Sequence, residues 1–432
     1  MHDLHEMAAA ARAAYLTLAS ADASARNRAL LAMADALLSE KDMIFAENAV
    51  DVRLAQEGRL AAPLLKRLAF GEEKLNSVVQ GLRDLAALPD PLGHTTLARE
   101  LTEGLNLYRV TCPIGVIGVI FESRPDALVQ IASLALKSGN AVLLKGGSEA
   151  ARTNLALCNV LRAAAEASGL PADFAQLLTS REEVSEMLRE DDLIDLIIPR
   201  GSKAFVRYIM DNSRIPVLGH ADGICHVYID ASADPEMALR VAVDSKVQNV
   251  SVCNAMETLL IHRAIAPAVL PALNEAFTAA HVSLVGDDET VRIIHCEPAT
   301  EDDWRTEYLD YRLSIRIVDS LDAAISHINT YGSHHTDCIV TRDDAAASEF
   351  LRRVDSAGVY RNVSTRFADG FVYGFGAEVG IATGKIHARG PMGVEGLTTY
   401  KYKLLGSGQT MGDVKAGRIS YTHRDLEGTC PI

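Results

Sequence analysis

The sequence lacks the features of a secreted, membrane-spanning or nucleic-acid-binding protein. Asp3 and Glu6 stand near the N-terminus, where a signal peptide carries basic residues, and no apolar run approaches the ~18 residues of a membrane span. The formal net charge of −15 opposes binding to nucleic acid or anionic membrane, because both need clustered Lys and Arg. We therefore expect no nucleic-acid partner, no membrane partner and a cytoplasmic location.

Cysteine is too sparse for a disulfide scaffold. The seven cysteines contain no Cys-x-x-Cys pair and leave one residue over, which fits a reducing compartment. A metal site is not expected either, because there is no His-Glu-x-x-His motif and no cysteine cluster. The adjacent His334 and His335 could not both point at one ion from a regular strand.

The composition is that of a large globular protein. The 432 residues are 48% hydrophobic and 23% charged, which suffices for two or three domains with their own cores. Residues 3–90 place apolar side chains three and four apart, which predicts helices. From residue 115 to residue 230, apolar runs alternate with amphipathic stretches, which predicts a parallel sheet covered on both faces. A second alternating stretch begins near Ser232.

Within the first alternating stretch, each apolar run predicts a strand and each amphipathic stretch a helix. The expected strands are 116–121, 141–144, 193–198 and 225–229, and the expected helices begin at Asp126, Ser148 and Ser202.

Cys253 lies in a loop of small and polar residues that precedes an apolar, strand-like run. Free cysteines usually pack as small hydrophobes, but a thiol in such a loop can be reached by a substrate. Cys253 is therefore the candidate nucleophile.

Seven segments, in a fixed order along the chain, resemble one family. They resemble the glutamate-5-semialdehyde dehydrogenases, also called γ-glutamyl phosphate reductases, a branch of the aldehyde dehydrogenase superfamily that acts in proline biosynthesis. Any one segment alone would be weak evidence. The segments are residues 121–127, 144–150, 198–202, 247–260, 306–310, 331–336 and 387–393.

The resemblance implies an α/β, aldehyde dehydrogenase-like fold with a Rossmann-type cofactor domain, an α/β catalytic domain, and an oligomerisation element formed by a β-hairpin and the C-terminal tail. In that family the hairpin pairs with the tail across a subunit interface, so we expect a homodimer or homotetramer. The assigned ranges are 1–97 and 113–230 for the NADPH-binding domain, 231–393 for the catalytic domain, and 98–112 and 394–432 for the oligomerisation element.

The resemblance also implies the reaction. In the family a cysteine thiolate attacks γ-glutamyl phosphate, phosphate leaves, and NADPH reduces the thioester to glutamate 5-semialdehyde, the second step of proline biosynthesis from glutamate. Cys253 matches that cysteine. The backbone N–H of Cys253 and the side chain of Asn254 are candidate oxyanion donors, although Asn254 is equally well explained as a loop-capping amide. Functional coupling to glutamate 5-kinase is a further expectation.

The expected cofactor is NADPH/NADP+. A strand followed by Lys145-Gly146-Gly147 and a helix N-terminus lets a backbone approach an anion closely. Ser148 stands where NAD-preferring relatives carry a Glu, and a hydroxyl tolerates the 2′-phosphate that a carboxylate would repel; Glu149 is adjacent. By resemblance, Lys145 and Gly147 contact the adenosine side, Arg200, Gly201 and Ser202 the pyrophosphate, and Glu307 the nicotinamide ribose.

Val217 marks a departure from hydrolytic aldehyde dehydrogenases, which carry at this position a Glu that activates the deacylating water. Without that base the thioester is protected from wasteful hydrolysis. The substitution favours acyl-phosphate chemistry over two alternatives, namely another aldehyde dehydrogenase that oxidises a small aldehyde and a catalytically silent homologue.

Substrate recognition requires polar and cationic side chains near the thiol. The glycine-rich segment 374–380 has the wrong spacing for a dinucleotide fingerprint and is expected to form a wall of the active site. The candidate substrate-binding residues are Ser123, Arg124 and His220, with His334, His335 and Arg389 as further candidates.

Overall fold

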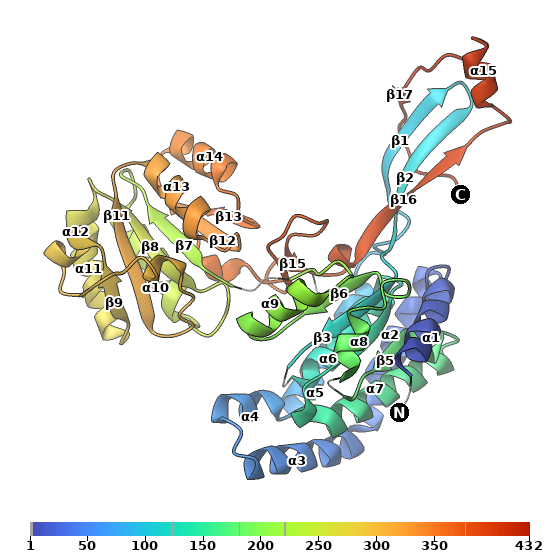
Figure 1. Ribbon diagram of the computed structural model, residues 1–432, viewed down its shortest axis with the longest axis horizontal. Helices are drawn as coiled ribbons and strands as arrows, with labels where there is room; N and C mark the ends of the chain where they lie inside the picture. The colour runs from blue at the N-terminus through green and yellow to red at the C-terminus, as the bar shows by residue number, and fades with distance from the viewer. Residues whose placement is uncertain (1–2, 123, 181, 220–221, 376) are drawn as a thin grey trace.

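The computed structural model describes residues 3–122, 124–180, 182–219, 222–375 and 377–432. The chain forms two α/β lobes, from which a β-hairpin projects together with the C-terminal tail (Figure 1). In this described part, each lobe is built on one parallel sheet and the projection on an antiparallel one. A search of the same residues finds no helix with the length and hydropathy required to cross a membrane.

The first lobe has a parallel sheet in the order β5-β4-β3-β6. Alternate residues of each strand point to opposite faces, so that Ile117 and Val119 enter one core while Val116 and Leu143 enter another. The strands are β3 (Val116–Ile120), β4 (Ala141–Lys145), β5 (Ala175–Leu177) and β6 (Leu196–Pro199).

Helices cover both faces of this sheet, as the alternating pattern predicts. The first core is closed by α2 (Ala23–Ser39), α3 (Lys41–Glu57), α5 (Glu72–Ala87), α6 (Pro125–Lys137) and α7 (Ala151–Ala167), and the second by α1 (Leu4–Leu18), α8 (Glu182–Met187) and α9 (Lys203–Asn212), while α4 (Ala62–Leu68) packs on α3.

The second lobe has a parallel sheet in the order β10-β9-β11-β8-β7-β12-β13. The strands are β7 (Cys225–Ile229), β8 (Met256–His262), β9 (Ser283–Gly286), β10 (Glu297–Pro298), β11 (Arg312–Val318), β12 (Thr336–Val340) and β13 (Gly358–Arg361). One face is covered by α10 (Pro235–Val247), α11 (Ala266–Ala279) and α12 (Asp288–Ile293), the other by α13 (Leu321–Tyr331) and α14 (Asp344–Arg353).

Two expected domain boundaries are wrong. The strand 225–229 was assigned to the cofactor domain, but it is β7, which pairs with β8 and β12 inside the second lobe. Val217 still bridges to Ile197 of the first lobe, so the crossing lies between Val217 and Cys225. An apolar run alone does not reveal which of two parallel sheets a strand joins.

The chain also returns to the first lobe earlier than expected. Residues 377–393 were assigned to the catalytic domain, but their apolar side chains complete the core of the first lobe, beside β14 (Gly380–Ala382) and β15 (Gly390–Met392). The returning core residues are Ala377, Val379, Ala382, Met392, Val394 and Leu397.

The projecting sheet has the order β16-β2-β1-β17. The hairpin was expected to pair with a C-terminal tail across a subunit interface, but here β16 pairs with β2 of the same chain over eight residue pairs. The edge strand β16 leaves Tyr400, Tyr402 and Leu404 exposed. The elements are β1 (Thr95–Thr102), β2 (Leu105–Pro113), β16 (Thr398–Leu405), α15 (Met411–Lys415) and β17 (Arg424–Asp425).

Asp195 links β3 to α1 in the first lobe, and its substitution tests how much these contacts stabilise the protein. Its Oδ2 accepts a hydrogen bond from Val116 N–H at 2.8 Å and lies 2.8 Å from Arg12 Nη1. Asp195→Ala should lower the free energy of unfolding by about 1–3 kcal/mol, because it leaves the Val116 N–H without this acceptor. Thermal melts of this variant and of Asp192→Ala, an exposed neighbour, make the comparison; equal melting temperatures would show that the bond contributes nothing.

Candidate active site

Cys253 lies in the loop between α10 and β8, at the edge of the seven-stranded sheet where its parallel strands begin. Gly223 precedes β7 and His335 precedes β12. Because β7 is hydrogen-bonded to both β8 and β12, these three loops start from the same edge and meet around the thiol.

Gly223 packs directly against the backbone of Cys253. A Cβ added at Gly223 would lie 2.1 Å from the Cys253 carbonyl oxygen and 2.5 Å from its Cα, so only glycine fits without displacing the loop. The Gly223 N–H donates to the Glu307 carboxylate. Gly223 therefore contacts both the Glu307 carboxylate and the Cys253 loop.

His335 is the side chain placed to accept the proton of the thiol. Its Nε2 lies 3.2 Å from Cys253 Sγ, and the imidazole is buried. On the other side of the ring, Nδ1 lies 2.9 Å from Thr336 Oγ1 and 3.7 Å from Cys225 Sγ. In the tautomer with its proton on Nδ1, that N–H donates to the Thr336 hydroxyl and Nε2 accepts from the thiol.

The electrostatic environment keeps the resting thiol protonated. Burial, together with the carboxylates of Glu378 and Glu307, raises the pKa of Cys253 to about 12, and Arg200 opposes that shift. Glu378 Oε2 accepts from the Gly370 N–H at 2.9 Å, and Glu378 Oε1 lies 3.9 Å from Arg200 Nη2. Proton transfer to a base is therefore required before the sulfur can attack.

The predicted cofactor residues at the ends of β4 and β6 lie at the carboxyl edge of the four-stranded sheet, whereas Glu307 lies before β11 in the second lobe. Strand order reverses between β3 and β6, and ligands of open α/β sheets bind at such a switch point. Arg200 follows β6, and its backbone N–H donates to the Ile120 carbonyl at the end of β3 at 2.7 Å. Gly201 and Ser202 open α9, with Ser202 as its N-cap. Arg200 is close enough to Cys253 to lower the pKa of its thiol against the opposing effect of burial.

The turn after β4 has the close packing expected of a cofactor turn. A Cβ on Gly146 would lie 2.2 Å from Asn154 Nδ2, and Lys145 Nζ donates to the Gly146 carbonyl at 2.6 Å. The helix was expected to begin at Ser148, but Ser148–Ala150 is a 3-10 turn and α7 begins at Ala151. Ser148 is exposed. The Glu149 carboxylate lies over Gly147, and its Oε1 is 2.1 Å from the position that a Cβ on Gly147 would occupy.

The remaining predicted residues are distributed unevenly. Ser123 and His220 lie outside the described residues. Arg124 is exposed at the N-cap of α6 and lies 3.5 Å from Asp126. His334 turns away from the thiol, with Nδ1 2.6 Å from the Asp355 carbonyl, and Arg389 pairs with the Asp355 carboxylate at 3.1 Å.

Asn254 has an anchoring contact. It is buried, and its side-chain Nδ2 donates to the Ala368 carbonyl at 2.9 Å. The backbone carbonyl of Asn254 accepts from Thr365 Oγ1 at 2.7 Å. These bonds tie the Cys253 loop to the segment that carries Arg366, a cation near the thiol that the sequence patterns do not single out. A role of Asn254 as oxyanion donor stays a prediction.

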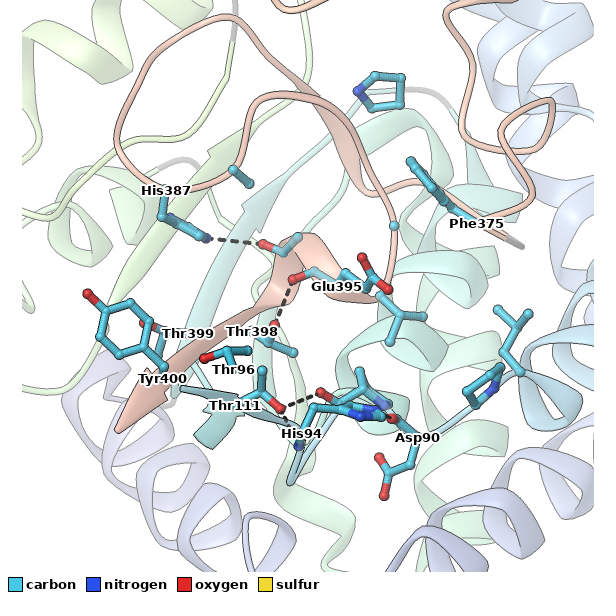
Figure 2. Close-up of a pocket in the computed structure, with 18 of the residues that line it drawn as sticks. Asp90, His94, Thr96, Thr111, Phe375, His387, Glu395, Thr398, Thr399 and Tyr400 are labelled. Carbon is cyan, nitrogen blue, oxygen red and sulfur yellow. Dashed lines mark hydrogen bonds between the residues drawn. The ribbon is translucent and has the colours of Figure 1, made fainter. Parts of the chain in front are cut away.

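One cavity among the described residues is not lined by Cys253. It has a volume of about 900 Å³ and lies where the hairpin joins the first lobe, between His94, Thr96 and Thr111 on one side and the segment from His387 to Tyr400 on the other (Figure 2). Arg389, a candidate for substrate binding, lines this cavity rather than the Cys253 loop. In the described ranges, no group of three or more His, Cys, Asp or Glu side chains is arranged to hold a metal ion.

A model of the aldehyde dehydrogenase family matches residues 1–293. The chain is 56% identical over 429 residues to the gamma-glutamyl phosphate reductase of Acetivibrio thermocellus, covering 99% of this chain and 100% of that one. The crystal structure of gamma-glutamyl phosphate reductase from Thermotoga maritima matches with a TM-score of 0.93 and 38% identity, covering 95% of this chain and 100% of that one. A propionaldehyde dehydrogenase of Rhodopseudomonas palustris, 16% identical over 93% of this chain and 97% of its own, shares the fold with a TM-score of 0.65.

The chain therefore belongs to the aldehyde dehydrogenase family and, within it, to the gamma-glutamyl phosphate reductases. This confirms the resemblance and the aldehyde dehydrogenase-like α/β fold expected from the sequence. Membership also implies a nicotinamide cofactor.

Gly223→Ala should lower the dehydrogenase activity by about a hundredfold or more, because the new methyl group displaces the Cys253 backbone. Gly219→Ala is the control, since its Cβ would be 3.4 Å from Pro199, an ordinary contact. Steady-state assays of both variants, with melting curves to verify folding, make the test. If the folded Gly223→Ala variant keeps full activity, close packing of Gly223 against Cys253 is not required for catalysis.

His335→Asn should reduce turnover by about 10²–10⁴-fold, the range for loss of a general base. His334→Asn is the matched control, because Asn tolerates the φ of 61° at this position and the side chain of His334 bonds the Asp355 carbonyl instead of the thiol. Equal loss of turnover in His335→Asn and His334→Asn would contradict the role of His335 as the base.

The rate at which iodoacetamide alkylates resting Cys253 should keep increasing above pH 8, since a pKa near 12 leaves the thiol protonated at neutral pH. An alkylation rate that levels off near neutral pH would contradict the protonated resting thiol.

Proposed function

We propose that the protein reduces L-glutamyl 5-phosphate to L-glutamate 5-semialdehyde with NADPH, releasing phosphate through a thioester on Cys253. This is the second step of proline biosynthesis from glutamate. The observation that carries the proposal is the pairing of Cys253 Sγ with His335 Nε2 at 3.2 Å. It is supported by Val217, which by resemblance stands where hydrolytic relatives carry the water-activating glutamate.

The first half of the reaction forms the thioester. His335 Nε2 takes the proton of Cys253, the sulfur forms a bond to the acyl carbon, and the bond from that carbon to the phosphate oxygen breaks with its electron pair leaving on phosphate. The Cys253 backbone N–H lies beside the sulfur and is suited to the transient oxyanion.

The second half releases the aldehyde. A nicotinamide cofactor, when bound, would supply the hydride that reduces the acyl carbon. The resulting oxyanion then collapses, the carbon–sulfur bond breaks, and the thiolate recovers its proton from protonated His335. Val217 packs on the core of the first lobe and offers no acceptor that could activate water against the thioester.

NADPH is the proposed form of the nicotinamide cofactor. Lys145 at the end of β4 is suited to the adenosine ribose, Arg200, Gly201 and Ser202 to the pyrophosphate, and Glu307 to the nicotinamide ribose. Exposed Ser148 leaves room for a 2′-phosphate, which supports NADPH. The nearby Glu149 carboxylate must be accommodated by the same turn.

The charges around the thiol suit the substrate. Arg200 and Arg366 lie close enough to Cys253 to interact with it electrostatically, and both are suited to the anionic groups of an acyl phosphate. Arg124, Ser123 and His220 remain candidate substrate residues.

We further propose that the enzyme forms a homo-oligomer and works in the cytoplasm. A homodimer or homotetramer is supported by the exposed edge strand β16, which offers unpaired backbone groups and tyrosines to a second copy. A cytoplasmic location is supported by seven cysteines that are all free thiols. Functional coupling to glutamate 5-kinase rests on the resemblance alone.

The reverse reaction gives the decisive test, because the acyl phosphate is labile. Glutamate 5-semialdehyde and NADP+ are mixed at varied phosphate concentrations, and NADPH is followed by absorbance for the native protein and for Cys253→Ala. NADPH should form only with phosphate and only with Cys253. Turnover without phosphate would instead indicate a hydrolytic aldehyde dehydrogenase, and no turnover in either protein a silent homologue.

A further inference from the structure

We propose that the buried pair Lys246–Glu257 is a positioning device that holds the backbone of Leu309 and thereby fixes Glu307 against the nucleotide. The proposal rests on the function given above, in which Glu307 contacts the nicotinamide ribose. Neither Lys246 nor Glu257 takes part in the proposed reaction steps.

The pair is fully enclosed. Lys246 Nζ lies 2.5 Å from Glu257 Oε2, and both side chains are 0% exposed. Lys246 lies on α10 and Glu257 on β8, the two elements that flank the Cys253 loop. A buried ion pair is a weak source of stability, because desolvation offsets the attraction, so its presence here calls for another reason.

The second oxygen of Glu257 is committed to a different loop. Glu257 Oε1 accepts a hydrogen bond from the Leu309 backbone N–H at 3.1 Å. Leu309 has a φ of 52°, in the left-handed region that a bulky side chain rarely adopts, and its side chain is 45% exposed. The bond to Glu257 holds the backbone at this residue, where the conformation is costly for a leucine.

Lys246 contacts the same loop by a second route. Its Nζ lies over the ring of Tyr308, 5.9 Å from the centroid. Tyr308 is the residue between Leu309 and Glu307, and its hydroxyl bonds Asp303 at 2.7 Å. The two members of the pair thus hold two consecutive residues directly after Glu307.

The loop position decides where the Glu307 carboxylate lies. That carboxylate accepts from the Gly223 N–H, and Gly223 abuts Cys253, so a shift of the loop would separate the ribose ligand from the nucleophile. Burial raises the pKa of Glu257 to about 7 against the opposing effect of Lys246, and Glu307 adds to the increase, which places the two carboxylates near each other. Lys246 and Glu257 act through Glu307 and are not themselves expected to touch the cofactor.

Two double variants separate the bond to Leu309 from the ion pair. Lys246→Met with Glu257→Gln removes both charges but keeps a carbonyl oxygen for the Leu309 N–H, whereas Lys246→Met with Glu257→Met removes the charges and the acceptor. Neither leaves a buried unpaired charge, so both should fold. NADPH binding is measured by fluorescence titration, with KM for NADP+ and kcat from the reverse reaction.

The Gln variant should bind NADPH within about threefold of the native protein, while the Met variant should bind it roughly tenfold to a hundredfold more weakly, the loss expected for one hydrogen bond to a charged acceptor. Equal affinities in the two variants would overturn the proposal, since a purely structural ion pair predicts no difference between them. The KM for glutamate 5-semialdehyde should change little in either.

A Glu307→Gln background tests whether the effect runs through Glu307. If it does, the Met variant should cause almost no further loss of NADPH affinity there, because coupled residues are not additive. Independent, additive losses would overturn the proposed route. If Glu307→Gln alone leaves NADPH affinity unchanged, the ribose assignment fails and the route fails with it. Because binding is measured without turnover, these outcomes are independent of whether the phosphate-dependent reaction is observed.

Discussion

The arrangement around the thiol depends on one backbone contact, the packing of Gly223 against Cys253. It allows the crossing between the lobes to run directly beside the nucleophile loop, with no side chain in between. The same residue donates its N–H to Glu307, so one glycine fixes both the nucleophile and a carboxylate placed for the cofactor. The contact brings the loop before β7 against the loop before β8.

The environment of Cys253 reflects a compromise between protection and reactivity. Burial among carboxylates keeps the sulfur protonated and so shields it from oxidation and alkylation, which require thiolate. Reactivity then depends on His335 and on cations such as Arg200. The same cations are suited to the anionic groups of the substrate, while Arg200 also lowers the pKa of the thiol.

Much of the architecture could be predicted from the sequence, because alternating apolar runs fix strand positions well. The expected strands at 116–121 and 141–144 correspond closely to β3 and β4, and 225–229 coincides with β7. Sheet membership was the error, since β7 is as apolar as the strands of the first lobe. Likewise, residues 377–393 carry no local sign that their partners lie some two hundred residues earlier.

The site was predictable where a motif supplied it and not where geometry did. Cys253 stands in a recognisable loop, whereas the role of His335 follows from its position just before β12, at the edge from which β8 also starts. Had the strand order been known, the loops preceding β7, β8 and β12 could have been grouped together. Gly223, Glu378 and Arg366 act through distances that no spacing in the sequence encodes.

The late return of the chain has a consequence for its synthesis. The core of the first lobe includes Leu30 and Leu128, but also Val379, Met392 and Leu397. The first lobe therefore cannot close its core as it leaves the ribosome, and its apolar face waits until nearly the whole chain has been made. The second lobe, contiguous from β7 to β13, has no such delay and can fold first. The second lobe can thus complete its core before the first lobe does, although it follows most of the first lobe along the chain.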